Sequence, residues 1–482
     1  MTRRFAKRAF VVLLMLAAAS MRVPAQEHGE HSQDKPQDTR QPHGQAHESM
    51  MDQSMMEAIM GPLGISLARE GSGTSWLPDA TPMYALHSMK GPWLLMLHGN
   101  AFLQYLDEGG DRGDEDFGSI NWLMGMARRK VGEGDFMLRA MLSAEPDTIG
   151  ECGYPDLLAT GESCRGGREL HDRQHPHDLF MEIAAKYERP LTEALGIELY
   201  GGPVGEPALG PTAYPHRLSA LPSPIAPIGH HWFDSTHISF GVVTAGLFGK
   251  RWKIEGSVFN GREPDENRYD LDLDPLDSYS GRVWFLPNER WALQVSIGRL
   301  KEAEPARNGR PAQDIRRPTA SATYHQPLAQ GGTWATTAAW GQNREGDEHT
   351  NAYLIETNLN LAERHIVFAR AEFVEKSGDD LVLEDQMLAD RIFNISTVGA
   401  GYVYQFAPLG NFVPSAGVRA AVSFVPSALE PFYGSRSPTS FGVFVSVRPR
   451  PMEMASMDSV KEHEMPRGGH VQPRPGQSDM QR

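Results

Sequence analysis

From about residue 93 to 448, short segments alternate apolar and polar residues at a period of two, broken by Gly, Pro, Asn and Asp. Trp252, Ile254 and Val258, for example, would share one face of a strand whose other face carries Lys253. A helix would scatter these side chains around its axis, whereas a strand sorts them onto two faces. The pattern therefore predicts a protein made mainly of β-strands.

Sixteen such segments can be counted, most of them near the ~9–11 residues that a tilted strand needs to cross a bilayer. The segments are 93–105, 119–130, 134–144, 178–189, 195–202, 235–247, 250–259, 277–286, 289–299, 316–325, 332–342, 350–360, 363–374, 393–406, 412–424 and 438–448. Connections after odd-numbered segments are long and those after even-numbered ones short, which is typical of transmembrane barrels. A β-sandwich or propeller needs no such alternation. We therefore expect an all-β fold, a transmembrane antiparallel β-barrel of about 16 strands, with 14 to 18 as the range.

The first 25 residues have the features of a secretory signal peptide. Basic residues near the start precede an apolar run over 9–20, and Val23-Pro24-Ala25 offers a cleavage site after Ala25. Twelve apolar residues are too few for a transmembrane helix, and no apolar stretch of eighteen follows. Export and a barrel together predict the outer membrane of a Gram-negative bacterium, with lipid and lipopolysaccharide as partners.

Composition divides the rest of the chain into three parts. Residues 26–90 are rich in Gln, His, Asp, Ser and Met, and we expect a mostly disordered periplasmic segment. Residues 91–448 form the barrel, and 449–482 are a second disordered tail, rich in Met and His. The formal charge of −15 argues against nucleic acid as a partner, because phosphate binding needs a basic face.

Two cysteines, Cys152 and Cys164, lie in one of the long connections. In an oxidising compartment the residues between them could close into a loop pinned by a disulfide. Two thiolates alone make a poor zinc site, so a structural disulfide is the expectation.

Several motifs indicate relatives. They are His171-Asp172-Arg173-Gln174-His175-Pro176-His177-Asp178, Gly205-Glu206-Pro207-Ala208-Leu209-Gly210-Pro211, His230-His231-Trp232 and Gly261-Arg262-Glu263-Pro264-Asp265. The chain resembles a group of uncharacterised, porin-like proteobacterial outer-membrane β-barrel proteins, often encoded near copper and heavy-metal efflux systems. The resemblance covers roughly residues 90–450. It implies a barrel and a link to metals.

The strand phase also predicts which side chains point into the lumen. The expected pore-lining residues are Arg139, Arg251, Lys253, Glu255, Arg282, Glu356, Arg370, Glu372 and Arg419. A polar lumen of mixed charge is the expected interior of a porin, and a barrel of ~16–18 strands leaves an aqueous channel. Alternatively, these charges pair across the barrel and close it. The proline-rich connection 203–234 either folds inward as a constriction or packs among the outer loops.

Both tails carry thioether and imidazole groups, which bind Cu(I) and other late transition metals. The candidate ligands in the tails are His28, His31, His43, His47, Met50, Met51, Met55, Met56, Met452, Met454, Met457, His463 and Met465. Met can instead serve as an apolar residue of a short amphipathic helix. A weaker candidate set, His171, His175 and His177, lies in a long outer loop, where a turn with backbone-bonded histidines is the alternative. No cofactor is required.

We expect a non-enzymatic, porin-like channel for small solutes or ions, linked to copper or heavy-metal handling, with periplasmic metal-efflux components as candidate partners. One alternative is a non-conducting outer-membrane anchor whose tails bind metal. A lipid hydrolase is a further alternative, because His237 and Ser239 have the spacing of a base and a nucleophile on one strand face. Thr236, Ile238, Phe240 and Val242 are predicted to face the lipid, however, so this pair would point inward.

Overall fold

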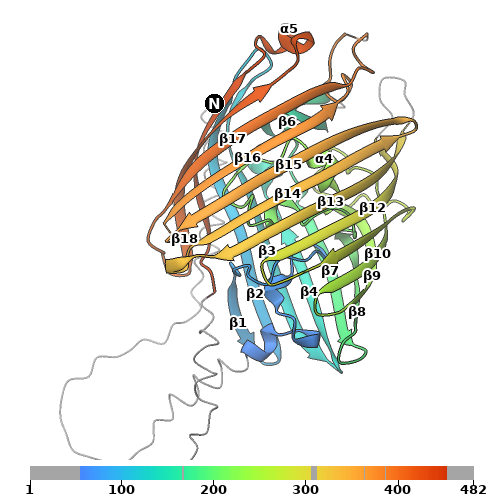
Figure 1. Ribbon diagram of the computed structural model, residues 1–482, viewed down its shortest axis with the longest axis vertical. Helices are drawn as coiled ribbons and strands as arrows, with labels where there is room; N and C mark the ends of the chain where they lie inside the picture. The colour runs from blue at the N-terminus through green and yellow to red at the C-terminus, as the bar shows by residue number, and fades with distance from the viewer. Residues whose placement is uncertain (1–54, 165–167, 305–311, 363, 386, 453–482) are drawn as a thin grey trace, which may run out of the picture.

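Strands arranged in one closed ring make up most of the molecule (Figure 1). The computed structural model describes residues 55–164, 168–304, 312–362, 364–385 and 387–452. The ring strands are β2 (Trp93–Glu108), β3 (Glu115–Val131), β4 (Gly134–Leu142), β7 (Phe180–Pro190), β8 (Gly196–Gly205), β9 (Ser239–Phe248), β10 (Trp252–Phe259), β11 (Ser278–Phe285), β12 (Trp291–Glu304), β13 (Gln313–Pro327), β14 (Thr333–Glu345), β15 (Glu348–Leu361), β16 (His365–Lys376), β17 (Phe393–Gln405), β18 (Phe412–Phe424) and β19 (Thr439–Pro449).

Each strand of the ring pairs antiparallel with its neighbour, and β19 pairs with β2 to close the barrel, with Val445 opposite Leu103. The predicted closed antiparallel barrel of sixteen strands is confirmed. A seventeenth strand, β1 (Leu86–Lys90), pairs with the first residues of β2 beside β19. No helix among the described residues is long and apolar enough to span a membrane.

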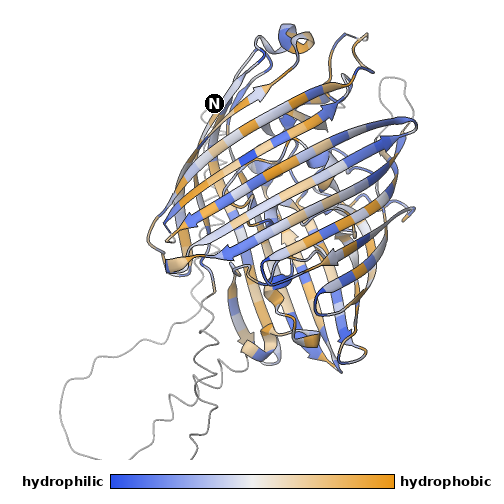
Figure 2. Cartoon of the chain, viewed as in Figure 1, coloured by the Kyte–Doolittle hydropathy of each residue, from blue (hydrophilic) through white to orange (hydrophobic). Residues whose placement is uncertain are grey.

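Hydrophobic and hydrophilic residues alternate along many of the strands (Figure 2). Ile355 on β15 is 54% exposed on the outside, whereas its neighbour Glu356 is buried inside. The same alternation holds for Ile254 and Glu255 on β10. The period of two is thus the direct consequence of a wall with one outer and one inner face.

The connections differ in length at the two ends of the barrel. One end has tight turns, such as 132–133 between β3 and β4 and 249–251 between β9 and β10. The other end has long connections, above all 143–179 between β4 and β7 and 206–238 between β8 and β9. The connection 143–179 contains α3 (Glu145–Thr148), β5 (Tyr154–Cys164) and β6 (Arg168–Gln174). The connection 206–238 contains η3 (Tyr214–His216), α4 (His230–Phe233) and η4 (Ser235–His237).

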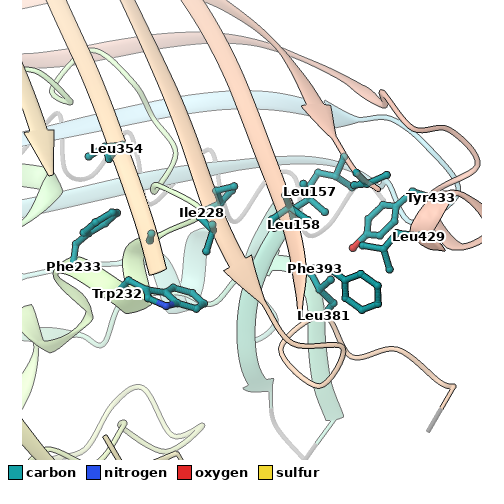
Figure 3. Close-up of a cluster of buried hydrophobic side chains, with 14 of the residues drawn as sticks. Leu157, Leu158, Ile228, Trp232, Phe233, Leu354, Leu381, Phe393, Leu429 and Tyr433 are labelled. Carbon is teal, nitrogen blue, oxygen red and sulfur yellow. The ribbon is translucent and has the colours of Figure 1, made fainter. Parts of the chain in front are cut away.

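The largest hydrophobic cluster joins these long connections to the inner wall (Figure 3). Trp232 and Phe233 of α4 and Leu158 of β5 belong to it, together with Leu354 of β15 and Phe393 of β17. The short helices η6 (Ser427–Leu429) and α5 (Glu430–Tyr433) complete it from the last long connection. The long connections are therefore packed against the barrel wall by apolar side chains.

The N-terminal part of the described chain also lies against the wall. It contains η1 (Pro62–Gly64) and η2 (Leu67–Arg69), and it buries Leu67 and Trp76. Trp76 packs edge-on against Phe248 of β9, with ring centres 6.4 Å apart. This differs from the prediction of a mostly disordered segment over 26–90, because residues 55–90 have defined structure; residues 26–54 lie outside the described residues.

Candidate functional site

The predicted pore-lining residues lie on the inner wall, with one exception. Arg139, Lys253, Glu255, Arg282, Glu356, Glu372 and Arg419 are buried, and the side chain of Arg370 is 11% exposed. Arg251 is exposed, which corrects the prediction for this residue. It precedes β10 and donates to the carbonyl of Pro287 in the turn after β11, so it lies at the rim of the barrel. That these residues line a pore stays a prediction.

Several of these inner-wall residues bind the N-terminal segment, here defined as residues 55–83. Arg139 Nη1 donates to the carbonyl of Gly73 at 2.6 Å, and Arg282 Nη2 to Thr74 Oγ1 at 3.1 Å. Lys186 of β7 forms an ion pair with Glu70, with 2.5 Å between Nζ and Oε1. The N-terminal segment is thus the first insert that occupies the barrel interior, held by charged wall residues.

The connection 206–238, here called the inserted loop, is the second insert. Arg217 lies between two carboxylates, with Nη1 2.6 Å from Asp234 Oδ2 and Nε 2.8 Å from Glu356 Oε1 on β15. Arg370 contacts the other oxygen of Glu356 at 3.1 Å and donates to the carbonyl of Ala226 at 3.0 Å. Of the two placements open for 203–234, the inward one is the one observed.

The β5–β6 hairpin forms a third insert. Lys376 at the end of β16 donates from Nζ to the carbonyl of Leu158 and to Thr160 Oγ1, both at 2.7 Å. Cys152 and Cys164 form a disulfide within this connection, which confirms the prediction. The hairpin is therefore held by a disulfide that joins Cys152, just before β5, to the last residue of β5, and by a buried lysine of the wall.

Small cavities remain between the inserts and the wall. One has a volume of about 40 Å³ and is lined by Glu108, Asp156, Arg370, Glu372 and Arg419. Another has about 110 Å³ and lies between the N-terminal segment, β2, β3 and the inserted loop. A water needs ~10–15 Å³ by this measure, so both have room for water.

Five histidines gather where the inserted loop meets the connection 143–179. The imidazole centres form a chain: His177 and His237 are 5.3 Å apart, His237 and His230 5.1 Å, His230 and His231 5.7 Å, and His231 and His175 6.5 Å. We call these five residues the histidine cluster. Their positions in the sequence span 63 residues, so only the fold of the two connections brings them together.

Acidic groups and carbonyls hold one nitrogen of several of these rings. Nδ1 of His177 lies 2.9 Å from Glu145 Oε2, and Nδ1 of His230 lies 2.8 Å from Asp234 Oδ1. Nδ1 of His237 lies 2.8 Å from the carbonyl of Asp234. These contacts fix the orientation of the rings, in the manner of outer-shell partners of metal-ligating histidines.

Burial favours the uncharged form of two histidines of the inserted loop, His230 and His237. It lowers the pKa of His230 to about 4, although Asp234 acts in the opposite direction. Burial, with His230 and His177 nearby, lowers the pKa of His237 well below its usual range. Burial alone would raise the pKa of Asp234, but Arg217 and His230 hold it below its ordinary value. The inserted loop therefore combines an ionised Asp234 with neutral imidazoles at His230 and His237.

The predicted outer-loop metal set is only partly brought together. His175 and His177 belong to the histidine cluster, whereas His171 is partly exposed and contacts Asp172 at 3.0 Å. Among the described His, Cys, Asp and Glu residues, the one group whose ligand atoms all lie within 4.8 Å of one another is a mostly exposed acidic trio, Asp265, Asp270 and Asp272. Metal binding by the outer-loop histidines stays a prediction.

Most of the predicted tail ligands cannot be placed. His28, His31, His43, His47, Met50, Met51, Met454, Met457, His463 and Met465 lie outside the described residues. Met55 and Met452 pack with other methionines at the tight-turn end of the barrel, and the amide of Met452 donates to the carbonyl of Met83. Met56 is half-buried.

The predicted faces of 235–242 need correction. Thr236, Ile238, Phe240 and Val242 are buried rather than turned to the lipid, and Val243 is the exposed residue. Gly241 has a φ of 87°, which interrupts the regular alternation at the start of β9.

His237 and Ser239 do not contact each other as a base and a nucleophile would. The Ser239 hydroxyl donates to the carbonyl of Thr236, while His237 Nδ1 faces the carbonyl of Asp234.

One set of inner-wall residues was missed by the sequence reasoning. Met96 and His98 on β2 and Met124 and Met126 on β3 all face inward, and His98 Nε2 lies 3.0 Å from Met124 Sδ. The sequence does contain a signal for this set. Met96 and His98 are two residues apart, as are Met124 and Met126, so the members of each pair lie on the same face of a strand. Trp122 beside them lines the 110 Å³ cavity and so lies inside the wall.

No known protein family matches the sequence, and no curated protein matches it. Solved structures with a similar fold include the anion-selective porin from Comamonas acidovorans, 11% identical over 74% of this chain and 99% of that one, with a TM-score of 0.43. OmpF of Salmonella typhi in complex with daunomycin is 10% identical over 75% of this chain and 100% of that one, with a TM-score of 0.45. OprB of Pseudomonas putida is 7% identical over 74% and 94%, with a TM-score of 0.44.

Proposed function

We propose that this chain forms a channel for small polar solutes or ions in the outer membrane of a Gram-negative bacterium. The N-terminal segment and the inserted loop hold the channel closed in the state described above. The observation that carries the proposal is the set of charged inner-wall residues whose partners lie on these inserts. Both ends of the chain would lie in the periplasm, since the tight turns share that end of the barrel.

The outer face supports the membrane location. Val243, Ile254 and Ile297 are each more than half exposed on it, and large apolar side chains recur on the outer side of nearly every strand. Soluble monomers rarely expose contiguous apolar patches larger than a few hundred Å². Lipid would cover this face, and lipopolysaccharide would meet the end with the long connections.

We expect Ile355→Arg to destabilise the barrel in lipid vesicles by about 2–4 kcal/mol if this position lies near the bilayer midplane, because the charge would face hydrocarbon. Urea unfolding of the barrel reconstituted in vesicles measures this. Leu273→Arg is the matched control, since Leu273 is 62% exposed on the connection between β10 and β11 and lies away from the strands. An equal loss of stability in both variants would contradict the proposal that Ile355 faces lipid.

The inner wall supports conduction. A barrel of ~16–18 strands has an interior wide enough for an aqueous channel when nothing fills it. Buried ion pairs give no general gain in stability over apolar packing. A barrel that only had to be filled would be stable with apolar contacts, whereas charges such as Arg139 and Glu356 suit a wall that becomes wet when the inserts leave.

Planar-bilayer recording tests the channel directly. The intact protein should pass little current, and Trp76→Ala should give larger or more frequent current steps. Trp76 packs against Phe248 and lies 4.8 Å from the Arg69 guanidinium, so its truncation should loosen the N-terminal segment by about 3–5 kcal/mol. Trp291→Ala is the matched control, because Trp291 is 38% exposed on the outer face and should leave the current unchanged.

The extent to which the inserts fill the barrel interior favours a second candidate function. If neither the intact protein nor Trp76→Ala conducts, the barrel is an anchor, and its His- and Met-rich tails are the working part. Such tails would bind copper or another late transition metal. They would meet metal-efflux components in the periplasm.

A further inference from the structure

A contiguous group of soft donor atoms lies on the inner wall of β2, β3 and β4. Met96 is the register partner of Met126, and His98 is the partner of Met124, which in turn opposes Met141 on β4. Met96, Met124 and Met141 are each at least 95% buried. Directly opposed residues on one face of a sheet have Cβ atoms only about 4.5–5.5 Å apart. Two thioether pairs and one imidazole–thioether pair therefore lie side by side.

Residues from both inserts cover this face. His216 of the inserted loop lies with its ring centre 5.8 Å from that of His98 and 4.8 Å from that of Trp122. Met83 of the N-terminal segment lines the same 110 Å³ cavity as His98 and His216. Its Sδ lies 3.0 Å from Nε2 of His87 on β1. The wall and the covering segments thus contribute the same two donor types.

The structure assigns to this place a binding site for one soft monovalent metal ion, Cu(I) or its analogue Ag(I). Met124 Sδ and His98 Nε2 are the first two ligands, and His216 is the third. Thioethers select Cu(I), and imidazole accompanies them in such sites. The inference does not depend on whether the barrel conducts, because it needs only the closed structure.

Methionine also serves as an adaptable apolar residue, and two observations favour ligands here. In two separate pairs, His98 with Met124 and His87 with Met83, an imidazole nitrogen lies 3.0 Å from a thioether sulfur. The 110 Å³ cavity is lined by His98 and His216 and gives an ion room beside these two rings.

The concentration of methionine sulfur atoms in this part of the wall also supports a site for a soft metal ion. At least ten of the 22 methionines of the chain belong to two hydrophobic clusters that share Met126: Met55, Met83, Met89, Met96, Met124, Met126, Met137, Met141, Met181 and Met452. The clusters run from the tight-turn end of the barrel to His98 and Met124. A soft ion arriving from that end would meet thioethers throughout.

The charges around the cavity are compatible with one added cation. Arg139 lines it but is paired with Glu182 at 3.1 Å. Glu70 also lines it and carries a negative charge that Lys186 offsets at 2.5 Å. Arg448, a further lining residue, has its guanidinium 4.0 Å from the ring centre of Tyr84. A monovalent ion bound by neutral ligands adds less charge than a divalent one would.

The test is a Cu(I) titration of the full-length protein in detergent against a chromophoric Cu(I) chelator. Met124→Leu and His98→Phe should each weaken one Cu(I) equivalent at least tenfold. The tails are intact in every sample, so any Cu(I) that they hold is the same background. Met387→Leu and His365→Phe are matched controls, because Met387 is 87% exposed on a connection and His365 is exposed at the start of β16.

The proposal is overturned if the two inner-wall variants, folded by circular dichroism, bind as many Cu(I) ions as tightly as the controls do. A second measurement needs no variant. Crystals of the intact protein soaked in Ag(I) should give an anomalous peak within bonding distance of Met124 Sδ and His98 Nε2. Silver peaks only at other positions would overturn the proposal equally.

Discussion

Replacing Arg217 by methionine is expected to release the inserted loop, at a cost of about 3 kcal/mol or more to its seated state. The guanidinium bridges Asp234 and Glu356, and all three side chains are at most 2% exposed. Removing one partner of a buried ion pair costs ~3–5 kcal/mol, because the remaining charge is left uncompensated. The value should fall at the lower end of this range, since Arg370 still contacts Glu356 and His230 still contacts Asp234.

Hydrogen exchange followed by mass spectrometry measures this effect segment by segment. A loss of 3 kcal/mol corresponds to an exchange about a hundredfold faster over residues 206–238. Peptides of β15 and β16 should keep their protection, because the wall does not depend on the loop for its backbone hydrogen bonds.

The matched control is Arg299→Met. Arg299 pairs with Asp314 at 2.9 Å, but both side chains are about a third exposed or more, so this pair contributes little to stability. If Arg217→Met leaves exchange in 206–238 as slow as Arg299→Met does, the ion triad does not hold the loop in the barrel.

The strands of the barrel wall could be predicted from the sequence because one physical rule governs their residues. Each strand has lipid on one side and the interior on the other, so Ile254 and Glu255, or Ile355 and Glu356, alternate in the sequence as they do in space. The tight turns add a second signal, since they separate consecutive strands without ambiguity. Both signals are local, and the sixteen strands could be predicted from them.

The inserts could not be predicted in the same way. The N-terminal segment has two short 3-10 turns and no repeating pattern, and its place depends on contacts with Arg139, Lys186 and Arg282 far along the chain. Whether 206–238 folds inward depends on Arg217 finding Glu356, which lies 139 residues later. Long-range pairs of this kind leave no periodic mark in a sequence.

Two local errors have specific causes. The predicted lipid face of 236–242 assumed a regular strand, whereas the backbone turns through positive φ at Gly241 and shifts the phase before Val243. No role was predicted for the inner methionines or for His98. Once β2 and β3 are paired, the register alone places His98 opposite Met124, so this part of the candidate site was within reach of the sequence.

Acidification is expected to release the same loop without any mutation. His216, His230 and His237 are neutral when the loop is seated, and the pKa of His230 is about 4 there because of burial. In a released, solvated loop the pKa of each imidazole would return to about 6.5. A base with a lowered pKa in the seated state stabilises that state above about pH 6.5, and this contribution is lost as the pH falls toward 4.

Glu206, at the start of the inserted loop, acts in the opposite direction. Burial raises the pKa of Glu206 to about 7, although Arg282 lowers it, so seating gains from this group as the pH falls from 7 toward 4.5. Three buried histidines oppose Glu206, so release of the loop should take up protons and the seated state should lose stability as the pH falls from about 6.5 toward 4.

Hydrogen exchange over 206–238, compared at pH 7.5 and pH 5.0 after correction for the intrinsic rate, provides the measurement. Exchange should rise steeply at pH 5.0 in the intact protein, and current through a planar bilayer should rise with it. The double variant His230→Asn and His237→Asn should lose most of this pH dependence, whereas His365→Asn, at an exposed outer position, should keep it. A loop equally protected at both pH values would show that burial of these imidazoles is not what couples the loop to protons.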